Sequence, residues 1–148
     1  MSTYTQITYQ IVFCTKYRKK VLTSPNRNEL FKFIWGVLKN KKCKLYRING
    51  VEDHIHILTH LHPSVSLSDL VKDIKISSSI YIKENYLFPD FKCWQPGYGA
   101  FTYGLKDRAR LIEYVKNQEE HHRVKTSKDE LKQTLLENEV SFEEQYLD

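Results

Sequence analysis

The order of two apolar periodicities along the chain constrains its fold more than any other feature. Four segments are typical of strands, the first of them rich in Thr, Tyr, Ile and Val, and three others repeat apolar residues at helical spacing. Their order is strand, helix, strand, strand, helix, strand, helix. It predicts an α+β fold with a ferredoxin-like (RRM-like) β-α-β-β-α-β core, an antiparallel sheet and one further helix. The predicted strands cover residues 3–14, 42–51 and 54–61, and residues 94–104 are expected to form a proline-glycine bend and a short aromatic strand. The predicted helices cover 25–41, 66–85 and 106–124.

Capping residues mark where the helices are expected to begin. Ser24 followed by Pro25 predicts the start of the first helix, with proline at the first helical position. Ser66, with Asp69 three residues later, predicts the start of the second. Asp107 is expected to cap the third.

The composition fits one globular domain. The chain has 148 residues, of which 41% are hydrophobic and 28% charged. Its apolar runs are far shorter than the roughly 20 residues that cross a bilayer, and its polar start lacks a signal-peptide core. Three cysteines without a C-x-x-C pair indicate neither disulfides nor a zinc knuckle. We therefore expect a cytoplasmic protein with reduced cysteines.

Charge divides the chain into a basic body and an acidic tail. Residues 1–126 carry 21 Lys and Arg against 11 Asp and Glu, whereas residues 127–148 carry 2 against 7. We expect residues 1–125 to form the functional domain. Residues 126–148 are expected to form an acidic tail, with a short amphipathic helix around Leu131, Leu135 and Leu136, that is not a separate domain.

The stretch "TKYRKK" (15–20) interleaves basic and aromatic residues directly after the first predicted strand. Such a pattern favours nucleic acid, because cations contact phosphates and an aromatic ring stacks on a base. A solvated turn is the alternative. The candidate phosphate contacts are Lys16, Arg18, Lys19 and Lys20, and the candidate stacking residue is Tyr17.

The stretch "HIHILTH" (54–60) alternates polar and apolar residues as a strand does. His54, His56 and Leu58 share one face, which is expected to be open, while Ile55 and Ile57 face the helices. Neighbours at i and i+2 stand about 6 to 7 Å apart, so His54 and His56 can converge on one metal ion. The alternative is a polar strand surface facing solvent.

The third predicted helix carries a polar stripe beside its core stripe. Its core residues are Leu111, Ile112 and Val115, whereas Tyr114, Gln118 and His121 lie together to one side. The Gln118 side-chain oxygen is a possible third metal ligand that would bring Tyr114 to the same ion, and His121 is a possible accessory residue. A packing tyrosine and a solvated glutamine are the alternatives.

Four motifs in series resemble the single-tyrosine HUH transposases of the small insertion-sequence transposase A type and their REP-associated relatives. The motifs are "IVFCTKYRKKVL" (11–22), "VEDHIHIL" (51–58), "WQPGYGAF" (94–101) and "YVKNQEEHH" (114–122). The resemblance spans about residues 5–125. One departure is Gln10, where relatives often have histidine, and it leaves the role of that position open.

The resemblance implies a metal-dependent transposase that cleaves and rejoins single-stranded DNA. His54, His56 and Gln118 would hold the metal, and Tyr114 would attack the phosphodiester to give a 5′-phosphotyrosine and a free 3′-hydroxyl. Imidazole and amide-oxygen ligands without thiolate favour Mg²⁺ or Mn²⁺.

The partners implied are DNA hairpin ends and a second copy of the chain, in a homodimer whose tyrosine helix serves the partner's site, with Gly104 as a hinge. Further DNA contacts are expected from Lys72, Lys75 and Ser78 on the second helix. The alternatives are a non-catalytic nucleic-acid-binding module on the same fold, and another HUH endonuclease of the replication-initiator or relaxase type. The compact chain, and a tyrosine helix that follows the histidine pair, favour the transposase over such an endonuclease.

Overall fold

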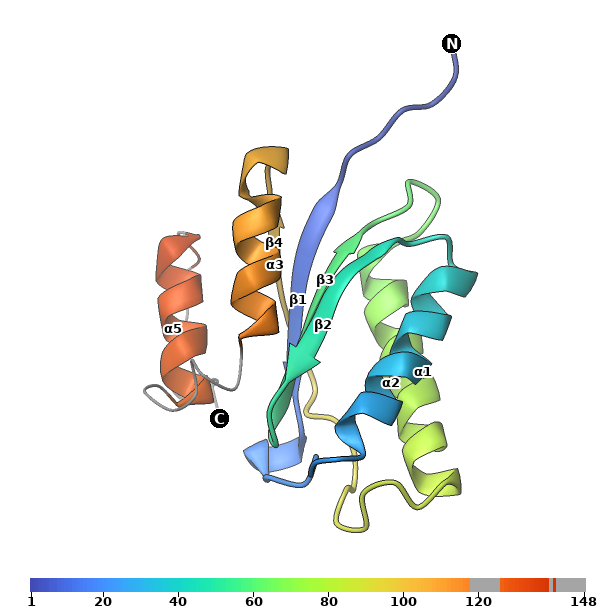
Figure 1. The fold of residues 1–148 in the computed structure, drawn as a ribbon, viewed down its shortest axis with the longest axis vertical. Helices are drawn as coiled ribbons and strands as arrows, with labels where there is room; N and C mark the ends of the chain where they lie inside the picture. Colours follow the sequence, from blue (N-terminus) through green and yellow to red (C-terminus); the bar gives the residue numbers. More distant parts are fainter. Residues whose placement is uncertain (118–125, 139, 141–148) are drawn as a thin grey trace.

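The computed structural model describes residues 1–117, 126–138 and 140, and its centre is a four-stranded antiparallel sheet. The strands are β1 (Thr8–Cys14), β2 (Leu45–Gly50), β3 (His54–His60) and β4 (Gly99–Tyr103), in the order β2-β3-β1-β4. Helices α1 (Arg27–Asn40) and α2 (Leu67–Glu84) connect β1 to β2 and β3 to β4. The predicted α+β fold and its β-α-β-β-α-β connectivity are therefore confirmed (Figure 1).

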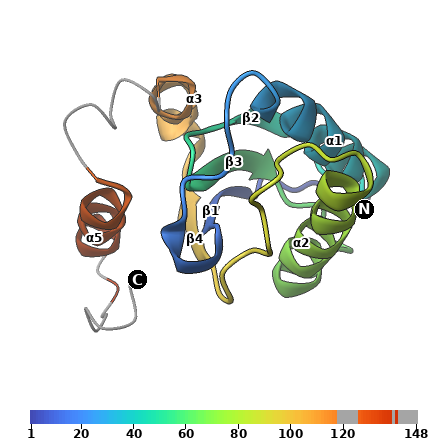
Figure 2. The ribbon, with the colours of Figure 1, turned by 90° about the horizontal axis from the view of Figure 1, so that it is seen from below.

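The sheet is covered on both faces (Figure 2). Helices α1 and α2 pack on one face, where the main core includes Ile11, Ile55 and Ile57 from the sheet. Helices α3 (Arg108–Lys116) and α5 (Ser127–Glu137) lie on the other side. Because α3 packs Leu111 and Val115 against Leu58, the histidine face of β3 is not open, and that expectation was wrong.

The start of α2 agrees with the prediction, whereas the start of α1 differs from it. Helix α2 begins as expected, since the Ser66 hydroxyl accepts a hydrogen bond from the Asp69 N–H at 3.3 Å. Helix α1 instead begins at Arg27, after Asn26, so the predicted Ser24 cap was wrong. Strand β4 is short and begins at Gly99, after the predicted bend. Before it, Trp94 forms only an isolated bridge with Thr15.

The segment of the third predicted helix has two described parts. A single turn, η2 (Leu105–Asp107), leads into α3, and Asp107 holds the N-cap position without a side-chain capping bond. Its carboxylate instead contacts Arg110 at 3.3 Å. The remainder of the predicted helix, residues 118–124, lies outside the described residues.

The β2–β3 hairpin fixes where the histidine strand begins. Gly50 pairs with Ile55, and a Cβ atom added at Gly50 would lie 2.4 Å from the His54 carbonyl oxygen. Only glycine fits this close approach of backbone to backbone. The turn therefore holds His54 at the first position of β3.

No helix in the described part of the chain is long and apolar enough to cross a membrane.

Candidate active site

His54 and His56 lie side by side on β3, beneath the helices α3 and α5. Their ring centroids are 5.0 Å apart, and their residues are only 3% and 2% exposed. The strand alternation therefore brings the predicted pair together, in a buried environment rather than on an open surface.

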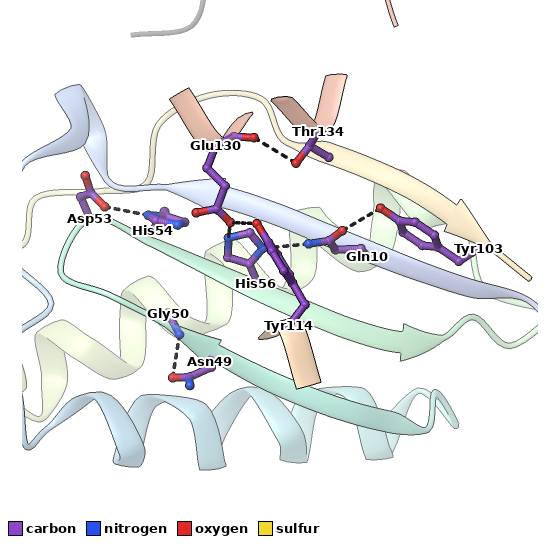
Figure 3. Close-up of polar contacts among 10 residues, drawn as sticks. All are labelled: Gln10, Asn49, Gly50, Asp53, His54, His56, Tyr103, Tyr114, Glu130 and Thr134. Atoms are coloured by element: carbon purple, nitrogen blue, oxygen red, sulfur yellow. Dashed lines mark hydrogen bonds and ion pairs between the residues drawn. The ribbon is translucent and has the colours of Figure 1, made fainter. Parts of the chain in front are cut away.

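A carboxylate orients the first histidine. Asp53 Oδ1 lies 2.7 Å from His54 Nδ1 (Figure 3). A carboxylate only accepts hydrogen bonds, so this contact keeps the proton on Nδ1 and leaves Nε2 with a lone pair for a metal. Asp53 thus holds the place of the outer hydrogen-bond partner that a metal-binding histidine commonly has.

An amide orients the second histidine. Gln10, which is 2% exposed on β1, places its side-chain nitrogen 2.9 Å from His56 Nδ1. The Tyr103 hydroxyl donates to the Gln10 side-chain oxygen at 3.0 Å. Burial raises the pKa of Tyr103, which keeps that hydroxyl protonated as a donor. Gln10, whose role the sequence left open, therefore contacts His56 directly.

Tyr114 reaches this cluster from α3, which packs on β2 and β3 of its own chain. Its ring centroid lies 6.2 Å from that of His56, and its hydroxyl donates to Glu130 Oε1 at 2.5 Å. Tyr114, the described member of the predicted polar stripe, is thus half-buried and aimed at the histidines. The other two members of that stripe, Gln118 and His121, lie outside the described residues.

Glu130 on α5 belongs to the same cluster, and sequence reasoning missed it. Its Oε1 lies 3.2 Å from His56 Nε2, and the residue is 4% exposed. Helix α5 is capped by Thr126, whose hydroxyl accepts from the Asp129 N–H, and it packs Leu131 and Leu135 against Phe101. The leucine pattern predicted the helix, but no spacing rule connects a residue of the tail to β3.

The residues fit a divalent metal. His54, His56 and Glu130 each offer one ligand atom, and these atoms lie within 4.8 Å of one another. Two imidazole nitrogens and one carboxylate oxygen form a common donor set for divalent cations. If a metal binds His56 Nε2, the Gln10 amide can turn so that its oxygen accepts the proton on Nδ1.

The basic turn η1 (Lys16–Arg18) is joined to the end of the site that carries Asp53. The Thr15 N–H donates to the Asp53 carbonyl at 2.9 Å, and the Thr15 hydroxyl donates to the Lys19 carbonyl at 2.7 Å. Tyr17 is 71% exposed, with a left-handed φ of 57°. The five predicted DNA-binding residues of this cluster therefore lie next to the histidine strand. Their contacts with DNA remain a prediction.

The predicted DNA contacts on α2 fare differently, because α2 lies on the other face of the sheet (Figure 2). Ser78 is fully buried and its hydroxyl accepts from Trp94 Nε1 at 2.9 Å, so its assignment to DNA was wrong. The Lys75 ammonium donates to the carbonyls of Gln95 and Gly97, and burial lowers its pKa. Lys75 therefore holds a loop instead of presenting a free cation. Lys72 is exposed and remains a prediction.

Known proteins share both the sequence and the fold. A transposase of the insertion element IS200 from Salmonella typhimurium is 28% identical over 121 residues, covering 78% of this chain and 79% of its own length. A candidate transposase structure from Deinococcus radiodurans has a TM-score of 0.64 at 23% identity, covering 80% of this chain and 95% of that one. A REP-associated tyrosine transposase bound to a REP hairpin has a TM-score of 0.59 at 18% identity, covering 79% and 72%.

The match to a family model covers most of the chain and includes β1, the histidine strand and Tyr114. Residues 3–118 match the model described as "Transposase IS200 like". The protein belongs to the family of IS200-like transposases.

Proposed function

We propose that this transposase cleaves and rejoins single-stranded DNA through a covalent bond to Tyr114. The observation that carries the proposal is the meeting of the Tyr114 hydroxyl, the His54–His56 pair and a buried carboxylate in one cluster (Figure 3). A nucleophile beside a metal site is one arrangement that cleaves phosphodiesters.

The reaction exchanges one ester bond for another. The Tyr114 oxygen bonds to phosphorus, and the bond from phosphorus to the 3′ oxygen of the preceding nucleotide breaks. That oxygen takes up a proton and leaves as a 3′-hydroxyl, while the 5′ side stays attached as a phosphotyrosine. A 3′-hydroxyl of another strand can later attack the phosphotyrosine and rejoin DNA without ATP, because the ester is conserved.

The residues around Tyr114 support this chemistry. A phenol has a pKa of about 10 in water and must lose its proton as it attacks. The Tyr114 hydroxyl already points its proton at Glu130 Oε1. His54 and His56, with Gln118 expected from the resemblance, would hold Mg²⁺ or Mn²⁺, which supplies positive charge to the phosphate.

DNA would approach along the basic turn. Lys16, Arg18, Lys19 and Lys20 flank the end of the sheet where His54 lies, and Tyr17 exposes its ring there. The REP-associated relative was solved bound to a hairpin, which supports hairpin DNA as the substrate. Because α3 packs on its own sheet, the geometry supports action of Tyr114 within one chain. The homodimer with exchanged helices, hinged at Gly104, stays a prediction.

The test uses the full chain with a labelled hairpin carrying a single-stranded extension. With Mg²⁺ or Mn²⁺ we expect a protein–DNA band that survives SDS. Tyr114→Phe should abolish this band while gel-shift binding persists, and His54→Ala should abolish it as well. A non-catalytic binding module would give no such band with any variant, and that result would refute the proposal.

A further inference from the structure

The acidic tail contributes one residue, Glu130, to the cluster formed by His54, His56 and Tyr114. Glu130 belongs to the segment that charge separates from the basic body, yet it is among the most buried polar residues of the described chain. Two other carboxylates on α5, those of Asp129 and Glu137, are exposed. The placement of Glu130 is therefore specific to one position on the helix.

Burying a carboxylate is costly unless cationic or hydrogen-bonding groups surround it. Here Oε1 contacts the Tyr114 hydroxyl at 2.5 Å and lies 3.2 Å from His56 Nε2. One oxygen thus touches the proposed nucleophile and a proposed metal ligand at the same time.

Packing on β4 and a helix cap hold α5 in place over the site. Leu131 and Leu135 pack on Phe101 and Tyr103 of β4, and Thr126 caps the first turn. A Cβ atom added at Gly99 would lie 3.8 Å from a Leu131 methyl group, so the helix packs closely on the strand there. Helix α5 therefore packs on β4, the edge strand of the sheet, beside the site.

We propose that Glu130 is a protein ligand of the divalent metal and that the same carboxylate positions the Tyr114 hydroxyl. This inference rests on the proposed function, since it concerns the same metal site. If so, helix α5 is part of the active site. Glu130 adds a charged ligand to His54 and His56, whereas the family resemblance would complete these two ligands with the neutral amide of Gln118. The charged ligand binds the cation more tightly than an amide would.

Mn²⁺ binding measured without DNA separates this role from catalysis. Isothermal titration of the full chain would compare the wild type with Glu130→Gln, which keeps the shape and a hydrogen-bond acceptor for Tyr114. Glu137→Gln is the matched control, because it removes the same charge from an exposed position of the same helix. His54→Ala reports on the histidine pair.

We expect Glu130→Gln to weaken Mn²⁺ binding about tenfold or more, and Glu137→Gln to leave it unchanged. If Glu130→Gln binds as the wild type does while His54→Ala does not, Glu130 is no ligand and the proposed function stands. If the wild type itself takes up no Mn²⁺, the metal-dependent function fails and the ligand assignment fails with it.

A second measurement needs no variant and guards against loss of α5 on mutation. Mn²⁺ broadens NMR signals of nearby nuclei, so the methyl signals of Leu131 and Leu135 should broaden more than those of Leu70, which packs on the opposite face. Equal broadening at the three leucines would contradict a metal site held by α5.

Discussion

On one face of the sheet, α1 and α2 enclose a continuous apolar core, and on the other, α3 and α5 cover two small apolar clusters set around polar side chains. The polar groups Gln10, His54, His56 and Glu130 are nearly inaccessible, as are the aliphatic residues opposite. Apolar burial stabilises without direction, whereas each buried polar group needs a partner at a set distance. The first face therefore contributes most of the apolar stabilisation, and the second carries the candidate active site.

The strongest test of this comparison uses adjacent residues of β3. Ile57 and Leu58 are both 0% exposed but face α1/α2 and α3, respectively. We expect Ile57→Ala to lower the free energy of unfolding by about 2–5 kcal/mol. Leu58→Ala should cost less in urea unfolding, because α3 can detach without loss of the main core, yet reduce the covalent DNA adduct more. Equal losses of stability would show that the two layers unfold as one.

A second test removes a polar contact and keeps the volume. Gln10→Leu takes away the hydrogen bonds to His56 and Tyr103. We expect Mn²⁺ affinity to fall about tenfold, as for other partners of ligand histidines. The free energy of unfolding should fall by about 1–3 kcal/mol. Tyr103→Phe, which leaves Gln10 in place, should have the smaller effect on the metal. The reverse order would mean that Tyr103, rather than Gln10, orients the site.

A third test makes similar changes on the two faces. Ser66 caps α2 and Thr126 caps α5 through the same type of side-chain hydrogen bond. Each change to alanine should cost its own helix about 1 kcal/mol. Ser66→Ala should therefore lower the urea midpoint without changing Mn²⁺ affinity. Thr126→Ala should weaken Mn²⁺ binding with little change in the midpoint.

The smallest effect on stability is expected at the basic turn. Lys19→Ala and Lys20→Ala alter exposed side chains, so the free energy of unfolding should stay within about 0.5 kcal/mol. Each variant should lower the salt dependence of hairpin binding by about one charge. Lys72→Ala on α2 should have less effect, because that helix lies on the far face. A loss as large as at the turn would place α2 in the DNA path.

The sequence predicted the features that follow from local periodicity. Alternation along β3 separated His54 and His56 from Ile55 and Ile57, and helical spacing placed Tyr114 beside the core stripe of α3. Both patterns depend on neighbours a few residues away, and the main core formed as they indicated.

The features that the sequence missed depend on packing between distant elements. Nothing local indicates that Glu130 contacts His56, which is 74 positions earlier in the chain, or that α3 and α5 bury the histidine face. Ser78 was predicted to lie on the surface of α2, but in the structure Trp94 packs over it and donates a hydrogen bond to its hydroxyl. Its burial depends on how a loop folds back over the helix, which helical periodicity does not contain.

The close approach of Gly50 to the His54 backbone has a consequence for how the site comes apart. Strand β3 is paired on both sides, with β1 and β2, and a slip by one residue would carry its histidines into the aliphatic core. Its amides should therefore exchange with deuterium only through global unfolding, while those of α5 exchange through smaller openings. The two parts of the candidate site would then open at different rates. The His54–His56 pair would stay in place until the protein unfolds, whereas Glu130 would leave the site whenever α5 detaches.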